Sequence, residues 1–205
     1  MKLDEWAEKH LVVTLPRDFS VWHWTRSPET VRKLRALIDA GGDLSASSTS
    51  DMGAVGHGLY LTTSAIDLME RGEEVLAATV VQGTRALMVH PDLFGVGFPE
   101  LFEIGLSRVG WSWELPSFAR KINPAEARPA PQVLDGLLAR LDLPCCVYIY
   151  GMHLAFMVRD ARCLRLVPEM DQARTVADYV KANPKDRSML VPHEVVTRWI
   201  ARRAS

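Results

Sequence analysis

Two short stretches of the sequence carry side chains that could hold a flat ligand bearing hydroxyl groups. The stretch VWHWT contains His23 and ends at Thr25, and the stretch GHGLYLTTS begins at Gly56 and contains Tyr60. An imidazole can hydrogen-bond a ligand hydroxyl without changing its protonation state, and a tyrosine ring can stack on a flat, positively charged ring. Glycines let the backbone approach a ligand closely. We therefore predict that Tyr60 is a stacking platform and that Gly56 and Gly58 clear the space above it.

Helices and strands must position these side chains. The segment SPETVRKLRALIDAGG predicts a helix, because Ser27 can cap its start, apolar residues recur at helical spacing, and Gly41 and Gly42 end it. The segment LYLTT predicts a short strand, and SAIDLMERGEEVLA predicts a second helix capped by Ser64. Further on, CCVYIYGMHLAFMVRD predicts two buried strands that are separated at Gly151.

The pattern of these elements favours an α+β fold. Strands and helices mix without a regular βαβ rhythm, which argues against a doubly wound sheet. The chain has 205 residues, of which 48% are hydrophobic, enough for one domain over residues 1–205. Residues 91–131, rich in glycine and proline, are expected to form an irregular insert that could recognise a target. Residues 168–205 are expected to form a C-terminal extension with two helices.

Other function classes lack their sequence signatures. Neither common glycine-rich nucleotide fingerprint is present, and the absence of C-x-x-C and H-E-x-x-H predicts that no metal is bound. A formal net charge of -1 argues against a molecule that binds nucleic acid through its overall charge. Cys145, Cys146 and Cys163 are expected to be buried, reduced thiols. With no signal peptide and no apolar run long enough to span a bilayer, we expect a cytoplasmic site of action and no membrane partner, although specialised secretion would leave no such signal.

The order of the two stretches resembles the ADP-ribosyltransferase superfamily, in its His-Tyr-Glu branch, which includes the poly(ADP-ribose) polymerases and diphtheria-like toxins. In that branch a strand ends in His-Gly-Thr/Ser, and a later strand opens with Gly-x-Gly-Ile/Leu-Tyr-Phe; here His23 and Tyr60 occupy the matching positions. Trp24 replaces the glycine of the first motif, whereas Thr25 keeps its small hydroxyl. The resemblance covers residues 20–90 well and the remainder weakly. It implies split mixed or antiparallel sheets with flanking helices.

The resemblance also implies NAD as the substrate and a role for each matching residue. His23 would anchor the adenosine-side ribose and Tyr60 would stack on nicotinamide, while Trp24 and Thr25 would frame its carboxamide. The implied NAD-contacting residues are His23, Trp24, Thr25, Gly58, Tyr60 and Thr62. The family's third motif places a glutamate at the start of a late strand, but HLAFMVRD has none there. Glu194 in VPHEVV and a group near His153 are the alternatives for this catalytic position.

The function that the resemblance implies is a mono-ADP-ribosyltransferase of toxin or effector type. It would modify a protein or nucleic-acid target and could have a cognate antitoxin or immunity protein as a partner. Two alternatives stay open at this point: an NAD glycohydrolase on the same fold, and an inactive module that binds NAD or ADP-ribose.

Overall fold

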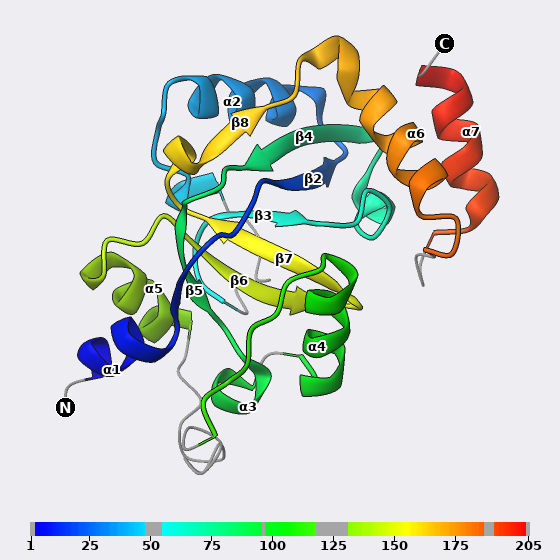
Figure 1. Ribbon diagram of the computed structural model, residues 1–205. Coiled ribbons are helices and arrows are strands. Elements are labelled where there is room, and N and C mark those ends of the chain that lie inside the picture. The colour runs from blue at the N-terminus through cyan, green and yellow to red at the C-terminus, as the bar shows by residue number, and fades with distance from the viewer. Residues whose placement is uncertain (1–2, 48–54, 96, 118–130, 187–190, 204–205) are drawn as a thin grey trace.

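One eight-stranded mixed sheet organises the α+β fold (Figure 1). The computed structural model describes residues 3–47, 55–95, 97–117, 131–186 and 191–203. The sheet order is β1-β5-β6-β7-β3-β2-β4-β8; β5 and β6 run parallel, and all other neighbours are antiparallel. The strands are β1 (Val12–Thr14), β2 (Phe19–Thr25), β3 (Leu59–Thr62), β4 (Glu74–Val80), β5 (Arg85–Met88), β6 (Cys145–Tyr150), β7 (His153–Val158) and β8 (Leu164–Leu166).

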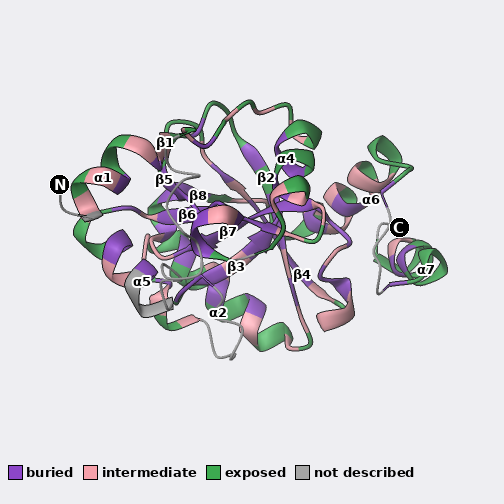
Figure 2. Cartoon of the chain, turned by 90° about the horizontal axis from the view of Figure 1, so that it is seen from below, coloured by how far each residue is buried: buried purple, intermediate pink, exposed green. Residues whose placement is uncertain are grey.

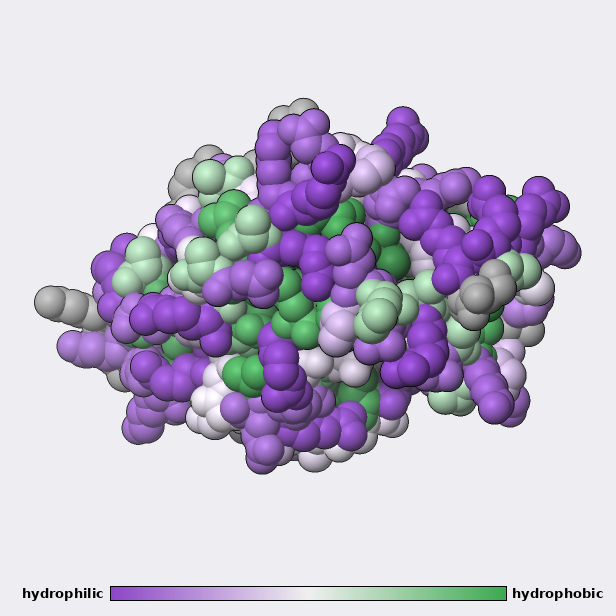
Figure 3. Space-filling view, turned by 90° about the horizontal axis from the view of Figure 1, so that it is seen from above, coloured by the Kyte–Doolittle hydropathy of each residue, from purple (hydrophilic) through white to green (hydrophobic). Residues whose placement is uncertain are grey.

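Helices flank this sheet, and most of them expose one side to solvent (Figure 2). They are α1 (Leu3–His10), α2 (Pro28–Asp39), α3 (Pro91–Phe94), α4 (Pro99–Arg108), α5 (Pro131–Arg140), α6 (Gln172–Ala182) and α7 (His193–Arg203). Hydrophilic side chains predominate on the face seen in Figure 3, and hydrophobic ones show between them near its centre. Among the residues that the structure describes, none of the helices is long and apolar enough to cross a membrane.

Strand alternation divides the core between the two faces of the sheet. On β6, Cys145, Val147 and Ile149 join the cluster that contains the buried side chains of α2 and α4. Cys146 and Tyr148 point the other way, into the cluster that contains those of α5. A third cluster, on the same side as Trp22 of β2, holds buried residues of α6 and α7. Both faces of β6 and β7 are therefore covered, as their unbroken apolar sequences predict.

The helix predicted after Ser27 is confirmed. The Ser27 hydroxyl accepts a hydrogen bond from the backbone N–H of Thr30 at 3.2 Å, and Pro28 occupies the first helical position. Val31, Leu34 and Ile38 are its buried residues, at the expected spacing. This helix fixes where the chain leaves β2, so it also fixes the end of the VWHWT strand.

The second predicted helix, which should start at Ser64, does not form. Between β3 and β4, where every residue is described, the chain forms one 3₁₀ turn, η2 (Met69–Arg71). Ala65, Ile66, Leu68 and Met69 are all buried, so the segment is enclosed rather than laid on the core by one face. The Ser64 hydroxyl donates to Asp186 at 3.0 Å as well as accepting from the backbone of Ile66. Tertiary burial has overridden the local helical pattern.

Residues 91–131 are more regular than predicted. They contain α3 and α4, and Phe102 and Leu106 of α4 are buried in the core. Pro91 and Pro99 each stand in the first turn of a helix, where proline is favoured, although the sequence analysis interpreted both as loop residues. Residues 118–130 of the predicted insert lie outside the described residues. The two helices predicted for residues 168–205 are present as α6 and α7.

Candidate active site

The central strands β2 and β3 separate from one another close to the sequence motifs. Their ladder contains a single pair, Trp22 with Thr62, whereas β2 is paired with β4 along its whole length. A cavity of about 690 Å³ lies at this separation; we call it the split cavity. Its lining includes all six residues for which NAD contacts were predicted: His23, Trp24, Thr25, Gly58, Tyr60 and Thr62.

His23 and Tyr60 reach this cavity from opposite faces of the sheet. Trp22 and Thr62 are directly opposite each other, so their side chains share one face. Counting by twos along β3 places the side chain of Tyr60 on that same face, whereas His23, next to Trp22, points to the other. The side chains of His23 and Tyr60 therefore lie on opposite faces of the sheet. Both line the same cavity because β2 and β3 have separated between them.

His23 is held across the separation by one hydrogen bond. Its Nδ1 lies 2.9 Å from the backbone oxygen of Tyr60. A carbonyl oxygen can only accept, so Nδ1 carries the proton and Nε2 is left as an acceptor. Burial lowers the pKa of His23 from its ordinary value, which keeps the ring neutral at neutral pH. The imidazole thus presents a neutral hydrogen-bond acceptor to a ligand.

The ring of Tyr60 is fixed by contacts at both ends. Its hydroxyl donates to the backbone oxygen of Gly56, and its ring meets the ring of Tyr148 edge-on, with centroids 6.0 Å apart. Burial raises the pKa of Tyr60 to about 12, so the hydroxyl remains protonated and keeps its donor role. Tyr60 is therefore a rigid, half-buried aromatic wall of the split cavity.

The two glycines of the GHGLY motif make room for the protein itself, which corrects the prediction that they clear space for a ligand. A Cβ atom on Gly58 would lie 2.4 Å from the Met157 sulfur and 2.6 Å from the Val158 oxygen. A Cβ atom on Gly56 would lie 2.3 Å from Asp135 Oδ1, and its φ of +112° also favours glycine. Both glycines let the loop before β3 pack tightly against β7 and α5.

Two of the predicted contacts have buried side chains. Trp24 is 1% exposed, its indole N–H donates to the Ala65 oxygen at 3.0 Å, and its ring packs edge-on against Trp199. Thr62 is fully buried, and its hydroxyl accepts from the backbone N–H of Ser64. The Trp24 indole is therefore not available to frame a carboxamide, whereas Thr25 at the strand end is partly exposed.

The charges that line the split cavity are all positive. Arg26, at the end of β2, and Arg71, in η2, are the charged residues among its described lining, and no carboxylate is part of it. Tyr148 and Tyr150 add aromatic surface, and Thr30 and Ser47 add hydroxyl groups. Two guanidinium groups beside aromatic rings favour an anionic ligand with a flat ring, such as a nucleotide.

The structure does not bring either candidate for the third catalytic position to this cavity. Glu194 is exposed in the first turn of α7 and is not among the lining residues. His153 is buried and faces Asp186, with 2.9 Å between His153 Nε2 and Asp186 Oδ1. A late glutamate and an apolar neighbour do not specify where an element packs, so the sequence could not place them.

Two carboxylates that the sequence analysis missed lie beside the cavity. Asp67 and Glu70 flank the lining residue Leu68 and precede the lining residue Arg71. Asp67 Oδ2 and Glu70 Oε2 are buried, and neither has a hydrogen-bond partner in the described part of the chain. Burial raises the pKa of Asp67 to about 6. The signal was the acidic segment DLMERGEE, which follows the Tyr60 motif directly and was interpreted as part of the helix capped by Ser64.

Behind these carboxylates, a buried polar cluster anchors the segment that follows α6. Asp186 accepts hydrogen bonds from Ser64, Tyr179, Arg108 and His153, at distances between 2.7 and 3.2 Å. Although burial alone would raise it, these hydrogen bonds hold the pKa of Asp186 well below its usual range. Both carboxylate oxygens are used by protein donors, so this cluster is a structural anchor.

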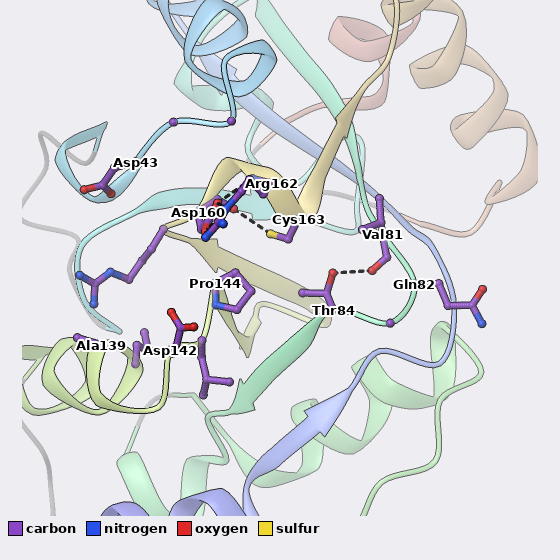
Figure 4. A pocket seen from close by; sticks show the side chains of 16 residues that line it. Asp43, Val81, Gln82, Thr84, Ala139, Asp142, Pro144, Asp160, Arg162 and Cys163 are labelled. Carbon is purple, nitrogen blue, oxygen red and sulfur yellow. Dashed lines mark hydrogen bonds and ion pairs between the residues drawn. The ribbon is translucent and has the colours of Figure 1, made fainter.

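A second cavity, of about 830 Å³, is lined mostly by residues that follow α2, β4, α5 and β7 (Figure 4). We call it the loop groove. Asp160 and Arg162 are ion-paired there, and Asp43 and Asp142 also line it. None of the predicted catalytic or NAD-contacting residues is in its lining. Among the described residues, no group of three or more His, Cys, Asp or Glu side chains could hold a metal ion.

No protein-family model and no curated protein sequence matches the chain. Among solved structures, the M. tuberculosis MbcT–MbcA toxin–antitoxin complex is similar, with a TM-score of 0.46 and 11% sequence identity. The match covers 81% of this chain and 89% of that chain. A likeness of this degree does not define a function for the present chain.

Proposed function

We propose that the protein cleaves the bond between nicotinamide and ribose in NAD and transfers ADP-ribose to a macromolecule. The observation that carries this proposal is the lining of the split cavity, in which two arginines, an aromatic wall and a neutral imidazole acceptor meet. An NAD molecule needs these groups: cations for its pyrophosphate, an aromatic face for its ring and an acceptor for a ribose hydroxyl.

In this proposal His23 Nε2 accepts a hydrogen bond from a ribose hydroxyl, and Tyr60 contributes the face for nicotinamide. Arg26 and Arg71 hold the pyrophosphate through charge-assisted hydrogen bonds. Thr25 is the side chain best suited to the carboxamide, since the Trp24 indole is buried. The protein or nucleic-acid target, a cognate antitoxin or immunity protein, and a cytoplasmic site of action remain parts of the proposal that rest on the family resemblance.

For the third catalytic position we propose Glu70 instead of Glu194. Cleavage of NAD builds positive charge on the ribose, which a nearby carboxylate stabilises electrostatically. Glu70 precedes the lining residue Arg71 and has a buried carboxylate oxygen without a partner among the described residues. Glu194 is exposed on α7. Glu70 is one residue from the lining and its other oxygen lies 3.8 Å from Arg71 Nε, so it is better placed for this role than Glu194.

The two glutamates provide a matched test. Purified wild type, Glu70→Gln, Glu194→Gln and Tyr60→Ala are incubated with NAD labelled in the adenosine half and a cell extract. We expect Glu70→Gln to lower incorporation of label about 100-fold or more, since one electrostatic group of this kind is worth that much. Tyr60→Ala should also be inactive, whereas Glu194→Gln should match wild type.

The products separate this proposal from its rivals. Label in protein or nucleic acid supports transfer, whereas free ADP-ribose alone would identify a glycohydrolase. No loss of NAD in any extract would leave a binding module. Full activity of Glu70→Gln together with an inactive Glu194→Gln would identify Glu194, not Glu70, as the third catalytic residue.

A further inference from the structure

His57 and Asp135 form a pair at the loop that leads into β3. The two side chains lie 2.5 Å apart, from His57 Nδ1 to Asp135 Oδ2, and the backbone N–H of His57 donates to Asp135 Oδ1 at 2.8 Å. Arg159 supports the pair from the end of β7, because its guanidinium donates to the Asp135 backbone oxygen at 2.8 Å. The side chain of Asp135 is 17% exposed and that of His57 is 63% exposed. A mostly buried carboxylate thus holds an exposed imidazole.

The hydrogen bond decides which nitrogen of His57 faces the solvent as an acceptor. An ionised carboxylate can only accept, so Nδ1 of His57 carries the proton. Nε2, on the other side of the ring, is hydrogen-bonded to no described residue. A carboxylate on Nδ1 and an open Nε2 form the arrangement in which imidazole removes a proton from a nucleophile, with the carboxylate fixing the tautomer.

His57 and Asp135 are not among the lining residues of the split cavity, but His57 directly precedes three of them in the chain. The three residues after His57, namely Gly58, Leu59 and Tyr60, all line it. The Tyr60 hydroxyl donates back to the oxygen of Gly56, the residue before His57. The loop that presents the imidazole is therefore tied to the aromatic wall of the proposed NAD site.

We propose, on the basis of the proposed function, that His57 is the general base that activates the acceptor of ADP-ribose. An oxygen of the acceptor, either water or a target hydroxyl, bonds to C1′ of the ribose. The bond from C1′ to the nicotinamide nitrogen breaks, and its electron pair goes to the nicotinamide ring, which leaves uncharged. The proton of the acceptor goes to His57 Nε2, and the Asp135 carboxylate stabilises the imidazolium.

A structural role for His57 predicts a different outcome on substitution. The backbone N–H of residue 57 can bond Asp135 whatever its side chain, so His57→Ala keeps that half of the anchor. Asp135→Ala removes both halves and would disturb the loop. His57→Ala is therefore the informative variant, and His193→Ala, which removes an exposed histidine from α7, is its control.

The first measurement is release of nicotinamide from NAD, which any acceptor, including water, permits. We expect His57→Ala to lower kcat about 100-fold while KM changes less than about twofold, in the range typical of a lost general base. Added imidazole should restore activity to His57→Ala and leave wild type and His193→Ala unchanged. A kcat of His57→Ala within about threefold of wild type would overturn the proposal.

The second measurement does not need turnover, so it separates this proposal from the proposed function. Nitrogen-15 NMR of the imidazoles at about pH 8 should find His57 protonated at Nδ1, and Asp135→Asn should shift this signal. Added NAD should shift the His57 Cε1 proton. If wild type releases no nicotinamide, the proposed function fails. The protonated nitrogen of His57 and the shift of its Cε1 proton with NAD still test whether His57 has the tautomer of a base and lies at the NAD site. A His57 protonated at Nε2 would overturn the proposal.

Discussion

The split cavity and the loop groove are both lined by polar residues at the ends of strands, but their charges differ. In the loop groove Arg162 is paired with Asp160, and the remaining charged lining residues are Asp43, Asp142 and Arg159 (Figure 4). In the split cavity both charged lining residues are arginines. The loop groove is the larger of the two, at about 830 Å³ against about 690 Å³. Arg71 Nε also lies 3.8 Å from Glu70 Oε1, next to this lining. Arginines beside aromatic rings, rather than volume, therefore distinguish the candidate site.

The largest expected effect tests this difference in charge. The double variant Arg26→Ala/Arg71→Ala should weaken NAD binding more than about 100-fold, because each charge-assisted hydrogen bond to phosphate contributes about 1.5–3 kcal/mol. Arg162→Ala in the loop groove should change the affinity less than twofold, about the error of the measurement. Calorimetric titration with NAD at about 0.05 M and 0.2 M salt measures both, and wild-type affinity should fall with salt.

Equal losses for the two regions would mean that NAD does not bind in the split cavity. Equal affinity of the double variant and wild type would show that the two arginines do not contact the pyrophosphate. Arg71→Lys separates charge from geometry, since lysine keeps the charge but lacks the planar, two-pronged donor set.

A smaller effect is expected at His23, which tests the hydrogen-bonding part of the comparison. Asparagine can still donate to the Tyr60 carbonyl but offers no acceptor in place of Nε2. We expect His23→Asn to fold and to bind NAD about 10-fold more weakly, the value of one good hydrogen bond. NAD titrations of folded wild type and variant check this, and unchanged affinity would remove His23 from the site.

The pH dependence of binding gives His23 an independent check. Because burial lowers the pKa of His23 below its ordinary value of 6.5, the acceptor should be intact at neutral pH. Affinity attributable to this residue should then be lost only as the pH falls below that value, when Nε2 becomes protonated. In His23→Asn this loss should be missing.

Much of the fold and part of the site could be predicted from the sequence. The cap at Ser27, the helix after it and the strands β6 and β7 follow from local patterns, which tertiary packing reinforces here. The α+β class followed from the order of such elements. The prediction of a helix that starts at Ser64 was wrong. Ala65, Ile66, Leu68 and Met69 are all buried, and the periodicity of a helix with one apolar face does not express this pattern.

The site could be predicted only where it coincides with a local motif. His23, Thr25 and Tyr60 were found because they stand in short, recognisable stretches. The pairing of His57 with Asp135, far apart in the chain, and the position of Glu70 depend on how β3, α5 and η2 pack. Glu194 was chosen because a carboxylate suits the reaction and VPHEVV resembles a glutamate followed by an apolar strand, but the segment forms the helix α7 and leaves Glu194 exposed.

The smallest expected effect compares one carboxylate from each region. Burial raises the pKa of Asp67, beside the split cavity, to about 6, whereas the guanidinium of Arg162 lowers the pKa of Asp160 in the loop groove. Asp67 faces the ionisable side chains of His153, Asp186, Glu70 and Arg108, and its own side chain is 13% exposed. A raised pKa means that the folded state binds the proton more tightly than the unfolded chain does. Its contribution is complete below about pH 4 and is lost as the pH rises through about 6.

Asp67→Asn keeps the shape of the protonated side chain and removes the charge. It should increase the free energy of unfolding at neutral pH by about 1 kcal/mol and flatten the decrease between about pH 4 and 6. Asp160→Asn should change stability by less than about 0.5 kcal/mol, because its ion pair is partly exposed. Urea titrations at a series of pH values measure both. A less stable Asp67→Asn would show that the folded protein stabilises the ionised carboxylate of Asp67. The difference between the split cavity and the loop groove would then not extend to this residue.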